Sequence, residues 1–259
     1  MQKLKIKKIL KKKNKSPIVC LTAYTKNIAK IADKYCDLIL VGDSLGMVLY
    51  GMKNTREVKI DTMLLHAKTV KKFAKKSLVV FDMPYKTYTN KSIAFKNAKK
   101  VIKFTKCDAV KLEGGSNIAN IIKHLVKKGI PVLGHIGLLP QTSGNFKIKG
   151  KSFNDKKRIF KDALSISKAG AFAIVIECVV ENLAKKITKT IKVPTIGIGA
   201  SKYCDGQILV TEDMLGLSNF SPKFVKQYAN LNILIEKCIK NYAKEVKIKR
   251  FPFTKNVYR

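Results

Sequence analysis

Four of the seventeen acidic side chains of this chain stand where short apolar runs end. They are Asp43, Asp82, Glu113 and Glu177. Each preceding run has the length and the apolar composition of a buried strand. Carboxylates are disfavoured in strands and are seldom buried without a partner, so their repeated placement calls for a chemical reason.

Carboxylate oxygens are hard ligands, and a site built from two Asp and one Glu suits a hard divalent cation such as Mg²⁺. Without a cation, several carboxylates in one cleft would repel one another. A structural alternative stays open for each residue taken alone. Asp43 or Asp82 could cap a helix or brace a loop, and Glu113 could be a turn residue before Gly114 and Gly115.

Three further polar residues, Lys111, His135 and Ser44, lie beside these strands or beyond them. Lys111 lies inside an apolar run, where an unpaired ammonium is costly, so we expect it to pair with a carboxylate of the protein or of a substrate. His135 alone is more often a hydrogen-bonded structural residue than a catalyst. Glu177, after five apolar residues, is the candidate general base, and Ser44 stands beside Asp43 in a glycine-flanked turn.

The elements that must position these residues alternate between strands and helices. Strands are expected over 17–22, 38–42, 77–81, 109–112, 130–134, 172–176, 193–198 and 206–210. Helices are expected over 26–35, 61–75, 91–105, 117–128, 155–168 and 180–190, with none between the last two strands. This order predicts an α/β fold, a single-domain (β/α)8 TIM barrel, whose strands end at one mouth. A doubly wound sheet is the alternative, although no early GxGxxG motif supports it.

The expected domain organisation is one barrel domain over residues 1–259. It carries a lysine-rich N-terminal arm over 1–15 and a C-terminal helix and tail over 222–259, helical to about 245. The stretch 138–152 has no clear periodicity and is expected to be a loop over the active site. The glycines of 197–200 could hold a phosphate or could simply pack tightly in the barrel mouth.

The formal net charge of +36 raises the hypothesis of a nucleic-acid-binding protein. Only four of the 53 basic residues are arginines, and the lysines are spread over nearly every helical segment, which favours a lysine-rich solvated surface over specific recognition. No apolar stretch is long enough to span a membrane, and no secretory segment is visible at the start. The six cysteines lack metal-ligand spacing, as expected for free thiols in the cytoplasm.

A series of motifs along the chain resembles the ketopantoate hydroxymethyltransferase family. The motifs are VGDSLGM (41–47), FDMPY (81–85), VKLEGG (110–115), GHIGLLPQ (134–141), IECV (176–179), IGIGA (196–200), DGQILV (205–210) and PKFVKQY (222–228). The resemblance implies a (β/α)8 barrel that uses Mg²⁺. It also implies transfer of a one-carbon unit from 5,10-methylenetetrahydrofolate to 3-methyl-2-oxobutanoate in pantothenate synthesis.

The resemblance also implies roles for individual residues. Asp43, Asp82 and Glu113 correspond to the metal-associated carboxylates. The residues that correspond to contacts with the keto acid are Asp43, Ser44, Asp82, Lys111 and His135. Glu177 corresponds to the proton acceptor. The implied chemistry is an enolate of the Mg²⁺-bound 2-oxo acid, which attacks the methylene group of the folate.

The implied partners are a small 2-oxo acid and folate, with no membrane and no specific nucleic acid. A homo-oligomer is expected, a decamer by resemblance to the bacterial family. The chain departs from the usual family pattern at Leu139, Val180 and Ser201, and its 142–150 loop is shorter. These changes bear on loop closure or folate contact more than on the chemistry.

The nearest rival is another Mg²⁺-dependent barrel enzyme of the phosphoenolpyruvate mutase and isocitrate lyase type. Those enzymes generally carry a catalytic cysteine in the loop over the active site, and none of the cysteines in this chain falls within 138–152.

Overall fold

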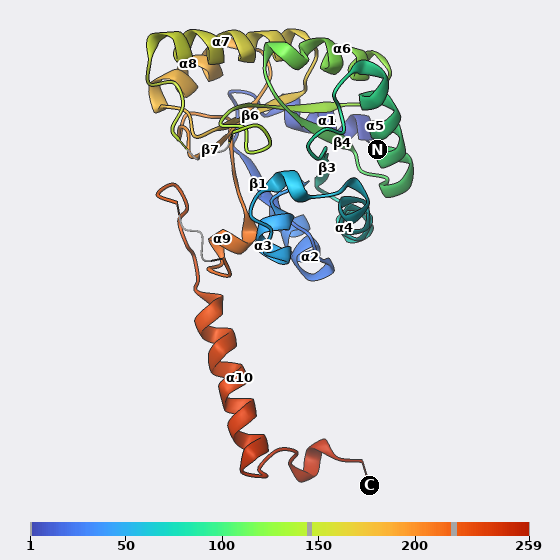
Figure 1. The fold of residues 1–259 in the computed structure, drawn as a ribbon, viewed down its shortest axis with the longest axis vertical. Helices are drawn as coiled ribbons and strands as arrows, with labels where there is room; N and C mark the ends of the chain where they lie inside the picture. The colour runs from blue at the N-terminus through green and yellow to red at the C-terminus, as the bar shows by residue number, and fades with distance from the viewer. Residues whose placement is uncertain (1, 144–146, 219–221, 259) are drawn as a thin grey trace. The chain divides into compact units, whose positions relative to one another are not determined.

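Eight parallel strands close into a barrel in chain order, which confirms the predicted (β/α)8 fold (Figure 1). The computed structural model describes residues 2–143, 147–218 and 222–258. The strands are β1 (Ile18–Thr22), β2 (Leu38–Val41), β3 (Leu78–Asp82), β4 (Ala109–Glu113), β5 (Val132–Gly137), β6 (Ala173–Glu177), β7 (Thr195–Ile198) and β8 (Gly206–Leu209). β8 pairs with β1 and thereby closes the barrel.

The strands form where they do because both of their faces are covered by apolar side chains. Alternate residues such as Leu38, Val80 and Leu133 point into the barrel and form one buried cluster. The residues between them, such as Val79 and Val110, belong to a second cluster between the strands and the helices. This double burial explains why the strands appear in the sequence as continuous apolar runs.

The helices lie outside the barrel, as Figure 1 shows for α5 to α8. The helices that follow successive strands are α2 (Lys26–Tyr35), α3 (Leu45–Tyr50) and α4 (Ile60–Phe73), α5 (Lys91–Thr105), α6 (Ala119–Lys127), α7 (Phe153–Lys168) and α8 (Glu181–Thr190). Short 3₁₀ turns are η1 (Thr55–Glu57), η2 (Ser116–Ile118) and η3 (Thr254–Asn256). Asn90 caps α5 by accepting from Ile93 N, and Ser152 caps α7 by accepting from Asp155 N.

The N-terminal arm is the helix α1 (Gln2–Lys11), which closes the barrel at the N-terminal ends of the strands. Its Ile9 is 2% exposed and belongs to the cluster inside the barrel. Its Lys5 Nζ donates to Ser77 O at 2.7 Å, just before β3. Beyond the helix, Lys13 Nζ lies 2.9 Å from Asp205 Oδ2, just before β8. The arm is therefore part of the barrel's packing, at the end opposite the candidate site.

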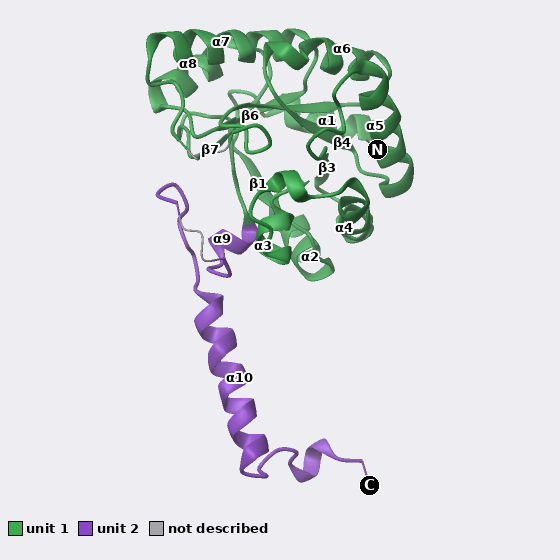
Figure 2. Cartoon of the chain, in the orientation of Figure 1, with its two compact units in different colours: residues 1–210 green, residues 211–259 purple. Residues whose placement is uncertain are grey.

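The chain divides into two compact units, residues 1–210 and 211–259 (Figure 2). The second unit contains α9 (Thr211–Met214) and α10 (Leu231–Lys247). The predicted helical start at 222 is wrong: the helix begins after Asn230, whose side chain accepts from Ile233 N, and Pro222 begins a turn. The expectation of one domain over 1–259 stays a prediction.

Two other differences concern the region that leads to the site. The fifth strand runs from Val132 to Gly137, beyond the predicted end at 134, so His135 lies inside it. The predicted helix over 117–128 is divided into η2 and α6. The predicted loop over 138–152 is irregular where it is described, up to the start of the helix α7, and residues 144–146 lie outside the described part. As predicted, no helix lies in the fully described stretch between β7 and β8.

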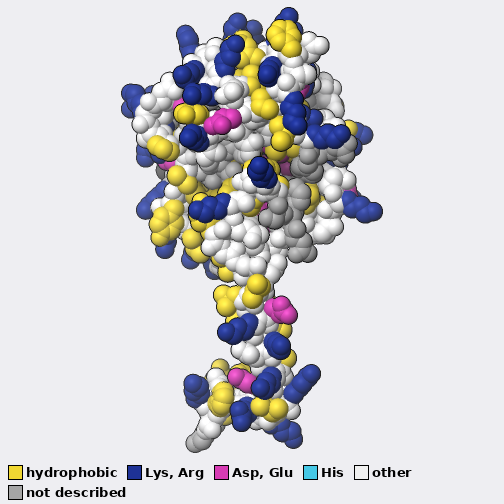
Figure 3. Space-filling model, turned by 90° about the vertical axis from the view of Figure 1, so that its left-hand side faces the viewer, with side chains coloured by type: hydrophobic (Ala, Val, Ile, Leu, Met, Phe, Trp, Pro, Cys, Tyr) yellow, Lys and Arg dark blue, Asp and Glu magenta, His cyan; other side chains and the backbone are white. Residues whose placement is uncertain are grey.

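Basic side chains are scattered over the face that Figure 3 shows, among apolar and other side chains. In the described part of the chain, no helix has the length and the apolar run needed to cross a bilayer.

Candidate active site

The alternation of the strands brings five of the predicted polar residues to the inner face of the barrel, near the C-terminal ends of the strands. Asp82 follows Leu78 and Val80 at a period of two, and Lys111 and Glu113 follow Ala109 in the same way. The strand register places Asp82 beside Lys111 and Glu113 beside His135. Glu177 ends β6 beside Gly137 of β5. The alternation that points apolar side chains into the barrel therefore continues to the C-terminal ends of the strands. There it points these five polar side chains inward, and together they form a polar layer.

Lys111 is 4% exposed and is held by carboxylates. Its Nζ lies 2.8 Å from both oxygens of Asp82 and 3.4 Å from Glu113 Oε1. Burial lowers the pKa of Lys111, but Asp82, Glu113 and Asp43 outweigh burial and raise it. Lys111 is therefore a permanent buried cation, and the prediction that it pairs with carboxylates is confirmed.

His135 lies between two carboxylates and is 1% exposed. Its Nδ1 is 3.2 Å from Glu113 Oε1, and its Nε2 is 3.2 Å from Glu177 Oε2. Neither contact meets the geometry of a well-formed hydrogen bond. Burial and Lys111 lower the pKa of His135, but the two carboxylates outweigh them and raise it to about 9. The imidazole is therefore protonated at neutral pH.

The two carboxylates beside His135 differ in accessibility. The side chain of Glu113 is 2% exposed, whereas that of Glu177 is 14% exposed. Burial raises the pKa of Glu113, but Lys111 and His135 outweigh burial and lower it to about 2. Glu113 is therefore a fixed buried anion, and Glu177 is the more accessible of the two carboxylates.

Asp43 and Ser44 lie in the turn between β2 and α3. The main-chain N of Asp43 donates to Asp82 Oδ2 at 3.3 Å, which brings Asp43 to the other carboxylates. Burial, Asp82 and Glu113 raise the pKa of Asp43 well above its usual value. The hydroxyl of Ser44 is 2.8 Å from that of the buried Tyr24. All seven predicted residues therefore lie at this end of the barrel, six of them linked through contacts or charge.

Comparison with known proteins identifies the family. Residues 3–254 match the family model described as ketopantoate hydroxymethyltransferase. The chain belongs to the ketopantoate hydroxymethyltransferase family. It is 53% identical over 254 residues to the 3-methyl-2-oxobutanoate hydroxymethyltransferase of Pelagibacter ubique, covering 98% of this chain and 99% of the relative. It is 48% identical to that of Phenylobacterium zucineum, covering 96% and 92%.

Solved structures with the same fold come from a different group of enzymes. A phosphonopyruvate hydrolase in complex with oxalate and Mg²⁺ matches with a TM-score of 0.63 at 10% identity, over 98% of this chain and 92% of that one. A 2,3-dimethylmalate lyase of the phosphoenolpyruvate mutase and isocitrate lyase superfamily matches with a TM-score of 0.64 at 13% identity, over 98% and 89%. At such identities the likeness shows the barrel fold alone.

The chemistry of the donor set in this hydroxymethyltransferase family member suits a hard divalent cation. Asp43, Asp82 and Glu113 are buried together, and burial with mutual repulsion raises the pKa values of Asp43 and Asp82. Within the described ranges, no three His, Cys, Asp or Glu side chains are arranged to hold a metal ion as they stand. Lys111 lies against Asp82 and Glu113. The three carboxylates are therefore chemically suitable ligands, but their side chains would have to move to coordinate a cation together.

Sequence reasoning missed Gln141, Tyr88 and Tyr24. Gln141 is 1% exposed, and its amide contacts Asp43, Met83 and Tyr88. Tyr88 and Gln141 lie in loops, where no periodicity marks an inward side chain. Gln141 stands inside the motif over 134–141, and that position was the only signal available for it.

The positions that depart from the family pattern do not belong to the carboxylate cluster. Ser201 is buried, and its hydroxyl accepts from Tyr203 N at 3.1 Å. The carbonyl of Leu139 accepts from the main-chain N of Thr142 and Ser143. Both therefore stabilise local turns of the loops around the site.

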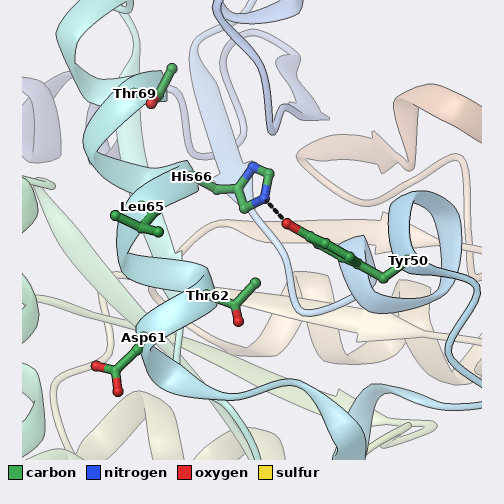
Figure 4. A pocket seen from close by; sticks show the side chains of 6 residues that line it. All are labelled: Tyr50, Asp61, Thr62, Leu65, His66 and Thr69. Carbon is green, nitrogen blue, oxygen red and sulfur yellow. Dashed lines mark hydrogen bonds between the residues drawn. The ribbon is translucent and has the colours of Figure 1, made fainter.

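A hollow of about 470 Å³ lies elsewhere on the barrel, at α4 and the end of α3 (Figure 4). Tyr50 OH and His66 Nε2 are hydrogen-bonded across it at 2.8 Å. It is lined by Tyr50, Asp61, Thr62, Leu65, His66 and Thr69. None of the predicted site residues lines it, so the hollow is separate from the carboxylate cluster in the barrel mouth.

Proposed function

We propose that the chain transfers a hydroxymethyl group from 5,10-methylenetetrahydrofolate to 3-methyl-2-oxobutanoate. The C3–H bond of the keto acid breaks, and C3 forms a bond to the methylene carbon that the folate carries. The bond between that carbon and the carrier breaks, and the carrier is released as tetrahydrofolate. Water supplies the hydroxyl group, and the product is 2-dehydropantoate, a precursor in pantothenate synthesis. Family membership and the names of the relatives support this reaction.

The observation that carries the proposal is the line of alternating charges across four strands. It runs from Asp82 through Lys111, Glu113 and His135 to Glu177. One end can bind an anionic keto acid beside a cation, and the other end offers the accessible carboxylate. A 2-oxo acid needs this combination if a proton next to its carbonyl is to be removed.

Asp43, Asp82 and Glu113 would hold Mg²⁺, which would polarise the keto group of the substrate and so acidify its C3–H. Four carboxylates and two cationic side chains lie in this layer, so a divalent cation would also neutralise the excess negative charge.

The chain's own residues position the keto acid and move its proton. Ser44 donates a hydrogen bond to the keto acid, with its hydroxyl held by Tyr24. Lys111 attracts the substrate carboxylate. Glu177 takes the proton from C3, and the imidazolium of His135, 3.2 Å from it, holds the carboxylate in place. His135 thus acts through Glu177.

The remaining parts of the proposal rest on the resemblance to the bacterial family. They are a cytoplasmic location, a homo-oligomer such as a decamer, and small molecules as the only specific partners. A DNA-binding titration over a salt series addresses the charge-based alternative. Binding that disappears at physiological salt marks a non-specific effect of the lysines.

The direct test incubates the protein with 3-methyl-2-oxobutanoate, 5,10-methylenetetrahydrofolate and Mg²⁺ and measures 2-dehydropantoate. No product from the metal-loaded wild type would refute the proposed reaction. In a parallel titration, Mg²⁺ should raise the Tm of the wild type, because a ligand of the folded state stabilises it. Glu113→Gln and Asp82→Asn should weaken this effect, and an unchanged titration would refute the metal assignment.

A further inference from the structure

Gln141 joins two of the carboxylates that the proposed function assigns to the cation. Its side-chain Nε2 donates to Asp43 Oδ2 at 2.8 Å, and its main-chain N donates to Glu113 Oε2 at 3.1 Å. One buried residue thus contacts one oxygen of each carboxylate. Asp43 comes from the end of β2 and Glu113 from the end of β4, so no single strand sets their separation.

The orientation of the Gln141 amide is determined by its other neighbours. Its Nε2 also donates to the carbonyl of Met83 at 3.0 Å, and its Oε1 accepts from Tyr88 OH at 2.5 Å. A flipped amide would place Oε1 against Asp43 Oδ2 and Met83 O, and NH₂ against the donating hydroxyl. Only the observed orientation satisfies all three neighbours.

Tyr88 is placed to act as this donor. Its oxygen lies 3.3 Å from both the main-chain N and the carbonyl O of Glu113. The contact with Gln141 Oε1, at 2.5 Å, is the shortest of the three, so the hydroxyl proton is directed to Gln141.

We infer that Gln141 is a positioning residue for Asp43 and Glu113, and that Tyr88 acts through Gln141 by locking its amide. This inference rests on the proposed function and names the residues that set its metal site. Partners behind metal ligands typically change metal affinity by about 10–100-fold when they are removed. Because Tyr88 and Gln141 act in series, their effects should not add.

The test is a calorimetric titration of the protein with Mg²⁺ alone, at fixed pH and salt. Gln141→Met keeps the side-chain length without donors, and we expect about 10–100-fold weaker binding. Tyr88→Phe removes one oxygen atom, and we expect a loss of about 10-fold, at the lower limit of that range. The double variant should bind within about twofold of Gln141→Met. The matched control is Tyr50→Phe, which removes a hydroxyl bonded to His66 outside the site and should leave binding unchanged.

Thermal unfolding of each variant separates a positioning effect from misfolding. Tyr88→Phe also removes an acceptor of the Glu113 main-chain N–H, so its Tm should fall slightly, but it should still unfold cooperatively. It should bind Mg²⁺ more weakly and have a lower kcat for C3–H exchange. Two outcomes would overturn this inference and leave the proposed function standing. One is wild-type Mg²⁺ affinity in both single variants, and the other is a double variant whose loss of affinity is the product of the two single losses. A wild type that binds no Mg²⁺ and makes no product would overturn the proposed function and this inference with it.

Discussion

Replacing Lys111 by Met should destabilise the protein far more than the same change at the surface. Lys111 Nζ is 2.8 Å from both Asp82 oxygens, and the two side chains are 5% and 2% exposed. Removing one partner of such a pair leaves a buried charge without its counterion and costs about 3–5 kcal/mol. For a chain of this size, this corresponds to a fall in Tm on the order of 6–20 °C.

The matched control is Lys100→Met. Lys100 Nζ lies 2.9 Å from Asp61 Oδ1, but these side chains are 53% and 80% exposed. Water and salt screen such a pair, so we expect a loss of about 0–1 kcal/mol. The assay is urea unfolding of both variants and the wild type in metal-free buffer.

The pH dependence of the Lys111→Met penalty has a definite sign. Burial raises the pKa of Asp82 even with Lys111 present, and removal of the ammonium would raise it further. The folded state then binds more protons than the unfolded state, so stability falls as pH rises. The penalty should therefore be larger at pH 8 than at pH 5. A Lys111→Met variant no less stable than Lys100→Met, or a penalty that grows on acidification, would refute the account of this ion pair.

Two further predictions concern the scaffold. Ile9→Ala should cost about 2–5 kcal/mol of unfolding free energy, because Ile9 is 2% exposed inside the barrel. The control is Leu4→Ala, at a position of α1 that is 63% exposed. An equally small loss in both variants would show that α1 does not close the barrel. Asp33→Ala should cost about 1 kcal/mol at pH 7, because the Asp33 carboxylate accepts from three main-chain N–H groups of residues 75–77 and is partly screened by water. Burial raises the pKa of Asp33, but these donors outweigh burial and lower it. The stability difference between Asp33→Ala and the wild type should therefore vanish as pH falls below about 4. A stability difference that persists in acid would contradict the assignment.

The barrel and most of its polar layer could be predicted because both follow one periodicity. Runs such as 77–81 and 172–176 are apolar on both faces, and the next inward position is Asp82 or Glu177. His135 shows the limit of this reasoning. The predicted strand ended at 134, whereas the backbone continues to Gly137, which takes a positive φ of 96° beside Glu177.

The loop partners could not be predicted, because an irregular segment carries no period that marks its inward side chains. Tyr88 and Gln141 meet across 53 positions of sequence through a single hydrogen bond. The helix α3 was missed because six residues after the turn at Asp43 are too few to show helical spacing. The helix α10 begins after a cap at Asn230, and a single capping residue is a weak signal in a sequence. The apolar residues after Pro222 were the stronger signal, and they led to a predicted start at 222.

The most direct test of the proposed chemistry is exchange of the C3 proton of 3-methyl-2-oxobutanoate with D₂O, followed by NMR with Mg²⁺ and without folate. The wild type should exchange this proton. Glu177→Gln should still bind Mg²⁺ and the keto acid and should lose exchange by about 10²–10⁴-fold, the usual contribution of a general base. Undiminished exchange in Glu177→Gln would remove Glu177 from the role of base and contradict the account.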